Sequence, residues 1–124
     1  MPLDPSSSAT KIQTFLSQEI GKNISVVVTD SMSRPYRSGV TNFALASSNL
    51  QSLIDLKGES DIYGNTLKST EIAIADELAA AAGLLMGQGD ELQPVVVVKG
   101  FNKSSYDINN AFDLIVDKDD DLYR

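Results

Sequence analysis

Three polar segments interrupt the apolar stretches of this 124-residue chain, and their side chains are the ones that could carry chemistry. The first begins with Asp30 and Ser31, a carboxylate and a hydroxyl that can both bind a hard metal ion. Arg34 and Arg37 follow and can neutralise phosphate or carboxylate groups. The spacing also fits a commoner arrangement, in which an aspartate at a strand end hydrogen-bonds its own loop.

The second polar segment spans residues 57–64. Glu59 and Asp61 can bind a cation there, and Lys57 can bind an anion. A solvated turn with paired surface charges is the more ordinary interpretation, because exposed ion pairs are frequent and contribute little free energy. The sequence leaves both interpretations open.

The third polar segment, residues 86–91, contains Gly87 and Gly89 after a long apolar stretch. Glycines allow a backbone to approach a phosphate closely, but a helix end followed by a turn uses the same residues, so this signal is weak. Within the apolar stretch, Asp76 and Glu77 lie among nonpolar neighbours. We expect one of the two to face inward, where a hydrogen-bonding role is more ordinary than catalysis.

The composition narrows the chemistry further. The chain has no cysteine and no histidine, which excludes thiol and histidine catalysis and leaves oxygen donors for Mg, Mn or Ca. Its formal net charge of -7 disfavours non-specific binding to nucleic acid and to anionic membranes. No apolar run approaches the ~20 residues of a membrane span, and the first residues do not resemble a signal peptide, so we expect a cytoplasmic protein.

The elements that must position these segments follow from the apolar pattern. Serines at 6–8 offer N-caps for an amphipathic helix of about four turns, which ends at Gly21. Residues 24–29 are almost all apolar, and most are β-branched. This composition predicts a strand buried on both faces, with Asp30 at its C-terminal edge.

The rest of the chain alternates loops with regular elements: a loop over 31–41, a strand over 42–48, a loop over 54–67 with a turn at 64–65, a helix over 70–86 and a strand over 94–98. The helix contains the small residues 79–83, so another element can approach its axis closely. This order predicts one α+β domain over residues 1–124, with a mixed sheet and two main helices.

Five ordered segments resemble the coenzyme F420-0:L-glutamate ligase family, the F420 gamma-glutamyl ligases, and the likeness covers nearly the whole chain. The segments are Leu3 to Ala9; Val28 to Ser31 with Arg34 to Gly39; Gly58 to Gly64; Ala75 to Ala82 with Met86 and Gly87; and Asp120 to Arg124. Agreement over five motifs in one order is too extensive for chance. Family members are much longer, so the resemblance implies that residues 1–124 form the C-terminal half of such a ligase, with the N-terminal half absent.

The resemblance implies an enzyme that uses GTP and a divalent cation, Mg or Mn, to join L-glutamate to coenzyme F420-0, and that works as a homodimer. Phosphoryl transfer of this kind needs neither histidine nor cysteine. The implied metal ligands are Asp30, Ser31 and Gln88, and the implied nucleotide contacts are Met86, Gly87, Gln88 and Gly89. Candidate contacts to substrate or phosphate are Arg34, Arg37, Glu59 and Asp61.

The chain departs from the family pattern at four positions, of which Tyr36 in place of tryptophan is the mildest exchange. Ser33 stands where the family usually has glycine, Val40 where it usually has glutamine, and Asn42 often corresponds to aspartate. The absent half would also carry an aspartate-containing motif and further GTP contacts. We therefore expect a partial chain that is inactive alone. Two alternatives stay open: a non-catalytic binding or assembly module with the same fold, and a ligase for a different carboxylate substrate.

Overall fold

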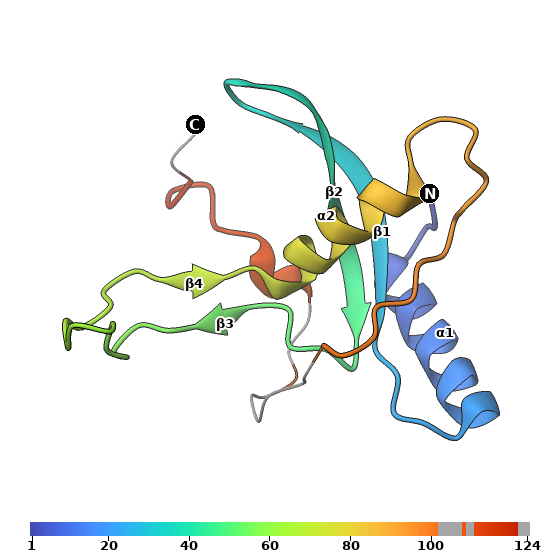
Figure 1. The fold of residues 1–124 in the computed structure, drawn as a ribbon, viewed down its shortest axis with the longest axis horizontal. Helices are drawn as coiled ribbons and strands as arrows, with labels where there is room; N and C mark the ends of the chain where they lie inside the picture. Colours follow the sequence, from blue (N-terminus) through green and yellow to red (C-terminus); the bar gives the residue numbers. More distant parts are fainter. Residues whose placement is uncertain (102–107, 109–110, 122–124) are drawn as a thin grey trace.

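The computed structural model describes residues 1–101, 108 and 111–121 (Figure 1). β1 pairs with β2, and β3 with β4, in two separate antiparallel sheets, so the predicted α+β class with two main helices is confirmed. The closing segment 120–124 of the family resemblance lies partly outside the described residues. The elements are α1 (Pro5–Ile20), β1 (Val26–Arg34), β2 (Arg37–Ser48), β3 (Ile54–Asp55), β4 (Glu71–Ile72), α2 (Ile74–Met86) and the short 3-10 helix η1 (Ala111–Leu114).

The first helix, α1, starts earlier than the serines at 6–8 predict. Its N-cap is Asp4, whose Oδ1 accepts the backbone N–H of Ser7 at 2.9 Å, so the predicted serine caps are wrong. Aspartate caps a helix as well as serine does, and Pro5 at the first helical position lacks an N–H that would need a partner. Gly21 ends the helix in the left-handed conformation, with φ 65°, as predicted.

β1 and β2 form a long hairpin, and the loop predicted over residues 31–41 does not exist. β1 continues to Arg34, β2 begins at Arg37, and only Pro35 and Tyr36 remain as the turn. Proline fixes its own φ at a negative value, and Tyr36 has φ 57°, which is the combination of a type II turn. The proline therefore marks one tight turn rather than an irregular segment. The strand predicted over residues 42–48 is confirmed within β2.

The prediction that the first strand is buried on both faces is wrong. None of the residues of β1 is buried, and Val26, Val27 and Val28 are only half-buried. Both helices pack on the hairpin, α2 mainly against β2, but no third strand joins it among the described residues. The apolar, β-branched run therefore lies in a sheet whose faces this part of the chain covers incompletely.

α2 packs on β2 through small side chains. Ala75 and Ala79 are buried there, and a Cβ added at Gly83 would lie 2.7 Å from Asn42 Cγ. This separation is shorter than a normal contact between carbon atoms, so the helix and the strand approach each other as closely as the small residues 79–83 predict. The buried cluster around this contact consists of Ala44, Leu50, Ala75 and Ala111, with Val27, Ile74, Leu78 and Leu114 packed against it.

Residues 54–72 form an arm that extends away from both helices (Figure 1). β3 and β4 pair along it, Ser60 and Thr66 bridge further out, and a turn that includes Gly64, with φ 82°, closes the end. The predicted turn is confirmed, but the predicted loop is partly a narrow antiparallel ladder. Because β4 takes up Glu71 and Ile72, α2 begins at Ile74, later than predicted.

The strand predicted over residues 94–98 is wrong. This segment belongs to no helix or strand, and it pairs with no strand in the ranges that the structure describes. Val95 and Val97 are 77% and 74% exposed. β-branched residues favour a strand only where a neighbouring strand is available, and the described residues supply no such strand to this segment.

The chain leaves a large apolar surface in water. Its accessible surface is 9325 Å², against about 6,450 Å² expected for a compact monomer of 13.3 kDa. Exposed large apolar side chains include Phe15 of α1 and Leu84 and Leu85 of α2. Large exposed apolar patches mark contact surfaces for proteins, membranes or ligands. No helix in the described ranges is long and apolar enough to cross a membrane.

Candidate functional site

Asp30 and Ser31 lie inside β1, so the predicted position of Asp30 at a strand end is wrong. Asp30 is exposed and pairs with Phe43, and its Oδ1 accepts the N–H of Ser31 at 2.7 Å. Ser31 is half-buried and pairs with Asn42. Successive side chains of a strand point to opposite faces, so the carboxylate and the hydroxyl diverge. The two groups therefore serve two different positions on the hairpin.

Asn42 brings together two residues that the sequence suggests as ligands. It stands opposite Ser31 in the ladder, where paired side chains share one face with about 5 Å between their Cβ atoms. Its Oδ1 accepts Nε2 of Gln88 at 2.5 Å. Asn42 is only 8% exposed and packs against Gly83 of α2, so its side chain is held in place. We call Ser31, Asn42 and Gln88 the amide–hydroxyl cluster.

The loop after α2 folds around a carboxylate of its own. Gly87 follows Met86, the half-buried last residue of α2, and ends the helix with φ 74°. The Oε2 atom of Glu91 accepts the N–H of Gly89 at 2.8 Å, and a Cβ added at Gly87 would overlap the same carboxylate. The backbone N–H groups of Glu91 itself, of Gly89 and of Gln88 hold the pKa of the Glu91 carboxyl below its usual range, although a smaller desolvation effect opposes them.

Arg34 and Arg37 face each other at the tip of the hairpin. This pairing places two basic residues next to each other in the ladder, on a chain that is acidic overall. The Nε atom of Arg34 is buried and has no hydrogen-bond partner in the described chain. A buried donor without an acceptor costs free energy, so an oxygen atom from a ligand or from another protein segment suits this position.

Glu59 and Asp61 lie on the arm formed by residues 54–72, and the structure gives Asp61 a definite local role. Its Oδ1 accepts the N–H groups of Tyr63 and Asn65, both at 2.8 Å, and its Oδ2 accepts Nδ2 of Asn65 at 3.0 Å. The Asn65 side chain, followed by backbone N–H groups of the turn, holds the pKa of the Asp61 carboxyl below its usual range. Both oxygens of Asp61 therefore stabilise the turn. Glu59 is exposed.

Lys57 pairs with carboxylates at the base of the arm. Its Nζ lies 2.7 Å from Oε1 of Glu71 and 3.6 Å from Oδ2 of Asp55. The hydrogen bond to Glu71 and the charge of Asp55 raise the pKa of the Lys57 ammonium above its usual value. All three side chains are well exposed, so these ion pairs contribute little stability. Lys57 thus forms ion pairs with one carboxylate of β3 and one of β4.

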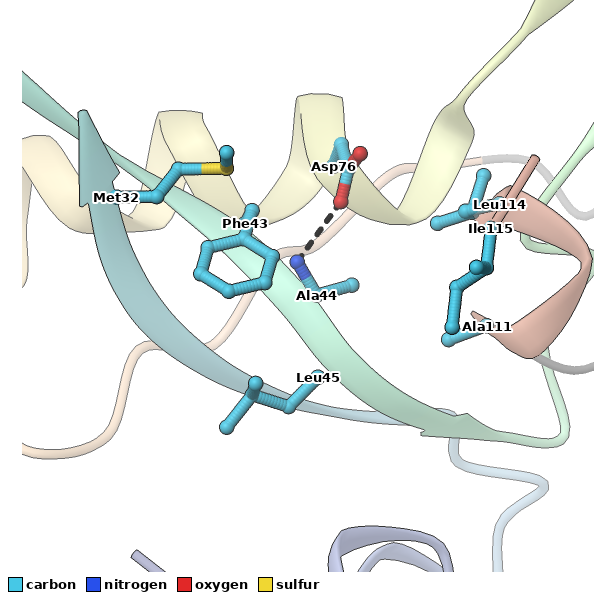
Figure 2. Close-up of a pocket in the computed structure, with 8 residues that line it drawn as sticks. All are labelled: Met32, Phe43, Ala44, Leu45, Asp76, Ala111, Leu114 and Ile115. Atoms are coloured by element: carbon cyan, nitrogen blue, oxygen red, sulfur yellow. Dashed lines mark hydrogen bonds between the residues drawn. The ribbon is translucent and has the colours of Figure 1, made fainter. Parts of the chain in front are cut away.

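Asp76 is the inward-facing carboxylate of α2, whereas Glu77 is exposed, as the sequence predicts for one of the two. Oδ1 of Asp76 accepts the N–H of Ala44 at 2.8 Å, where the register of the hairpin shifts, so the predicted hydrogen-bonding role is confirmed. Figure 2 shows this bond beside a cavity of about 330 Å³. Its lining residues are Met32, Phe43, Ala44, Leu45, Asp76, Ala111, Leu114 and Ile115. Asp76 is the only charged side chain among them, so the cavity suits apolar packing.

The donors present would suit two separate hard-metal positions, one on each face of the hairpin. Asp30 offers a carboxylate on one face of the hairpin, and the amide–hydroxyl cluster offers neutral oxygens on the other. Oxygen ligands of these types suit Mg or Mn rather than softer metals. In the portion of the chain that the structure describes, no three Asp, Glu, His or Cys side chains come together. A complete site would therefore draw further oxygens from outside these residues.

Two residues gain importance only in the structure. Asn42 is marked by the sequence solely as a departure from a family pattern, and Glu91 has no assigned role. The signal for Asn42 is its polarity within an apolar strand, because a buried amide requires hydrogen-bond partners. The signal for Glu91 is its place two residues after Gly89 and four after Gly87, because these glycines leave backbone N–H groups open to a carboxylate.

Comparison with known proteins identifies the class of protein to which these segments belong. Residues 1–100 match the family described as F420-0:Gamma-glutamyl ligase, a group of ligases. The chain belongs to this family. Relatives named Coenzyme F420:L-glutamate ligase are 41% identical over 124 residues in Methanocaldococcus jannaschii, 44% over 101 residues in Methanothermobacter thermautotrophicus and 40% over 124 residues in Methanococcus maripaludis strain C7.

These matches cover 100%, 82% and 100% of this chain, in the same order, but only 49%, 40% and 50% of the relatives. The chain therefore spans about half the length of the curated relatives that it matches. All of the segments that carry sequence-suggested ligands, from Asp30 to Glu91, fall within the family match.

Proposed function

We propose that the chain supplies the C-terminal half of a ligase that joins L-glutamate to coenzyme F420-0, with GTP and a divalent cation, Mg or Mn. The family match over residues 1–100 carries this proposal, because that span contains every segment with a suggested ligand or substrate contact. The names of the relatives support coenzyme F420 and glutamate as reactants. The absence of cysteine and histidine is compatible with this chemistry.

The proposed reaction has two steps. A carboxylate oxygen of F420-0 attacks the γ-phosphorus of GTP, and the bond to the β-phosphate oxygen breaks, so GDP leaves with the electron pair. The amine of glutamate then attacks the activated carbonyl carbon. The bond from that carbon to the phosphate oxygen breaks, the nitrogen loses a proton, and an amide and inorganic phosphate result. Both steps depend chiefly on positioning and on neutralisation of negative charge.

Two sets of residues would hold the cation and the nucleotide. Asp30 would bind a cation on one face of the hairpin. Ser31 and Gln88 would supply oxygen ligands for a cation on the other face. A bound divalent cation would neutralise charge on the phosphate oxygens. The loop from Met86 to Gly89 would contact the nucleotide, because its glycines leave backbone N–H groups accessible to phosphate.

The hairpin tip would bind an acidic part of the substrate. Arg34 and Arg37 lie opposite each other there, and the buried Nε of Arg34 has no acceptor within the described residues. A carboxylate or phosphate would satisfy this donor and neutralise both charges. This unpartnered nitrogen favours the hairpin tip, rather than the arm, as the place where substrate binds. On the arm, Asp61 already accepts hydrogen bonds from Asn65.

We further propose that the isolated chain is inactive and that the working enzyme is a cytoplasmic homodimer in which each protomer also contains the complementary half. The large exposed apolar surface and the incomplete oxygen ligand set support this arrangement. Small misplacements of reacting groups lower rates by orders of magnitude, so half a site cannot hold the required geometry. No role for nucleic acid or a membrane is proposed for this acidic chain.

A ligase for a different carboxylate substrate is the second candidate. Ser33 and Val40, two of the departures from the family pattern, pair with each other in the ladder. Both are exposed, and they lie next to Arg34 at the hairpin tip. These two departures therefore alter one patch of the proposed substrate-binding region rather than two separate places. A local change of this kind favours altered substrate choice with the same reaction type.

The test is GTP-dependent addition of glutamate to F420-0, read as the increase in product mass. The 124-residue chain is assayed alone and then with the complementary half of the Methanocaldococcus jannaschii relative, added in trans or by fusion. We expect turnover only in the reconstituted protein, and turnover by the chain alone would refute the partial-site proposal. A reconstituted protein that folds and binds Mn but leaves F420-0 unchanged would favour another carboxylate substrate or a non-catalytic binding module.

A further inference from the structure

The carboxylate of Glu91 is bound by the backbone of its own loop. Gly89 donates its N–H to Oε2 at 2.8 Å, and the N–H groups of Gln88 and of Glu91 itself also stabilise the charged form. Gly87 lies against the same carboxylate, where a side chain would overlap it. The turn over residues 87–91 is therefore a concavity of backbone donors that is filled by an anion.

Concavities of backbone N–H groups bind oxyanions in general, whether carboxylate or phosphate. The segment 86–93 contains no lysine or arginine, so these N–H groups are the donors that an external anion would meet there. Residues 88–91 are exposed, and the two glycines place no side chain over the turn. The hydrogen bond from Gln88 Nε2 to Asn42 anchors the start of the loop to β2. The concavity is thus both accessible and held in place.

We propose that the Glu91 carboxylate is an internal substitute for a phosphate group, which occupies the N–H groups of the turn until a phosphate from a ligand displaces it. The inference rests on the proposed function in one respect, namely that this ligand is the polyphosphate of a nucleoside triphosphate. A carboxylate and a phosphate both present acceptor oxygens, so the exchange leaves the donors of the turn satisfied. Glu91 thereby keeps the empty loop formed and weakens phosphate binding.

Competition sets the size of the effect. An external phosphate binds only those molecules in which Glu91 has left the turn, so the apparent dissociation constant rises as that fraction falls. If the carboxylate fills the turn about nine-tenths of the time, its removal tightens apparent binding by about tenfold. Asp90 offers a matched control, because it carries the same charge in the same loop, is exposed, and makes no hydrogen bond within the described residues.

The experiment titrates the 124-residue chain with inorganic pyrophosphate and, separately, with GTP, both without metal, while ¹⁵N NMR follows the backbone amides of residues 87–91. Three variants are compared with the unaltered chain: Glu91→Ala, which empties the turn; Glu91→Gln, which keeps an acceptor without charge; and Asp90→Ala. We expect pyrophosphate to shift the Gln88 and Gly89 amides and to bind about tenfold more tightly to Glu91→Ala. Glu91→Gln should lie in between, and Asp90→Ala should change less than either.

Equal tightening in Asp90→Ala and Glu91→Ala would reveal a general charge effect and overturn the inference, as would amides that no ligand shifts in any variant. Tighter binding of GTP than of pyrophosphate, or the reverse, supports the displacement of Glu91 by phosphate in either case. The preferred ligand identifies which source of phosphate the turn binds. Ligase turnover is a separate readout. Tightened binding in a reconstituted protein that cannot ligate glutamate would reject the proposed function alone, and turnover with unchanged binding would reject this inference alone.

Discussion

Replacing Gly83 with alanine tests the contact that holds the amide–hydroxyl cluster in place. The new Cβ would lie 2.7 Å from Cγ, 2.8 Å from Oδ1 and 3.1 Å from Cβ of Asn42. Alanine is favoured over glycine in a helix by about 1 kcal/mol, but overpacking costs about 1–3 kcal/mol. Asn42 would also move away from Gln88, which loses a hydrogen bond worth about 1 kcal/mol. We expect a net destabilisation of about 1–3 kcal/mol.

Urea unfolding followed by circular dichroism measures this loss as a lower midpoint at unchanged slope. Asn42→Ala provides the second arm of a double-mutant cycle, because it leaves only the 3.1 Å contact to Cβ. In that background Gly83→Ala should cost less or stabilise the helix. Ala81→Gly, at an exposed position of α2, calibrates helix propensity and should cost about 1 kcal/mol. A stabilising Gly83→Ala change in the otherwise unaltered chain would refute the close packing of α2 on β2.

The other predictions concern three carboxylates. Asp30→Ala should remove weak Mn or Mg binding measured by calorimetry, whereas Glu77→Ala, which removes an exposed carboxylate of α2 outside the proposed ligand set, should leave that binding in place; unchanged affinity in Asp30→Ala would move the site elsewhere. Asp76→Ala should destabilise the fold by about 1–3 kcal/mol in urea, because the N–H of Ala44 loses its acceptor, and Asp76→Asn, which keeps an acceptor oxygen, should recover most of the loss. The lowered pKa of Asp61 stabilises the turn above the ordinary carboxyl pKa, and this stabilisation is lost as pH falls through the lowered folded value. The protection factors of the amides in residues 61–65, which correct the exchange rates for the intrinsic effect of pH, should therefore fall below about pH 4, and Asp61→Asn should remove this acid dependence; unchanged protection factors at acid pH would contradict it.

Local signals in the sequence predicted both helices well, and the errors at their starts have local causes. Gly21 and Gly87 end α1 and α2 because glycine adopts positive φ without a steric penalty. The start of α1 was misplaced because Asp4 and the serines after it are equally good caps, and only the hydrogen bond to Ser7 distinguishes them. The start of α2 was misplaced because pairing of Ile72 with Ile54 is not visible in the neighbouring residues.

The strands were predicted less well because a strand is completed by residues distant in the sequence. The run over residues 94–98 has the composition of a strand, yet it remains unpaired among the described residues, and composition cannot supply a partner. Conversely, the polar segment after Asp30 has the composition of a loop, yet pairing with β2 keeps it extended as far as Arg34. Neighbouring strands, rather than intrinsic preference, decided both outcomes.

The sequence by itself determined the family of this protein, its α+β class, the C-terminal ends of its helices, and the absence of thiol and imidazole groups, because these follow from residue types and ordered motifs. Only the tertiary structure decided which side chains meet. It separated Asp30 from Ser31, because adjacent residues in an extended strand point to opposite faces. It joined Gln88 to Asn42 across 46 residues, because Gly83 allows α2 to lie directly on β2. Such proximity depends on how elements pack, and packing is a property of the folded chain as a whole.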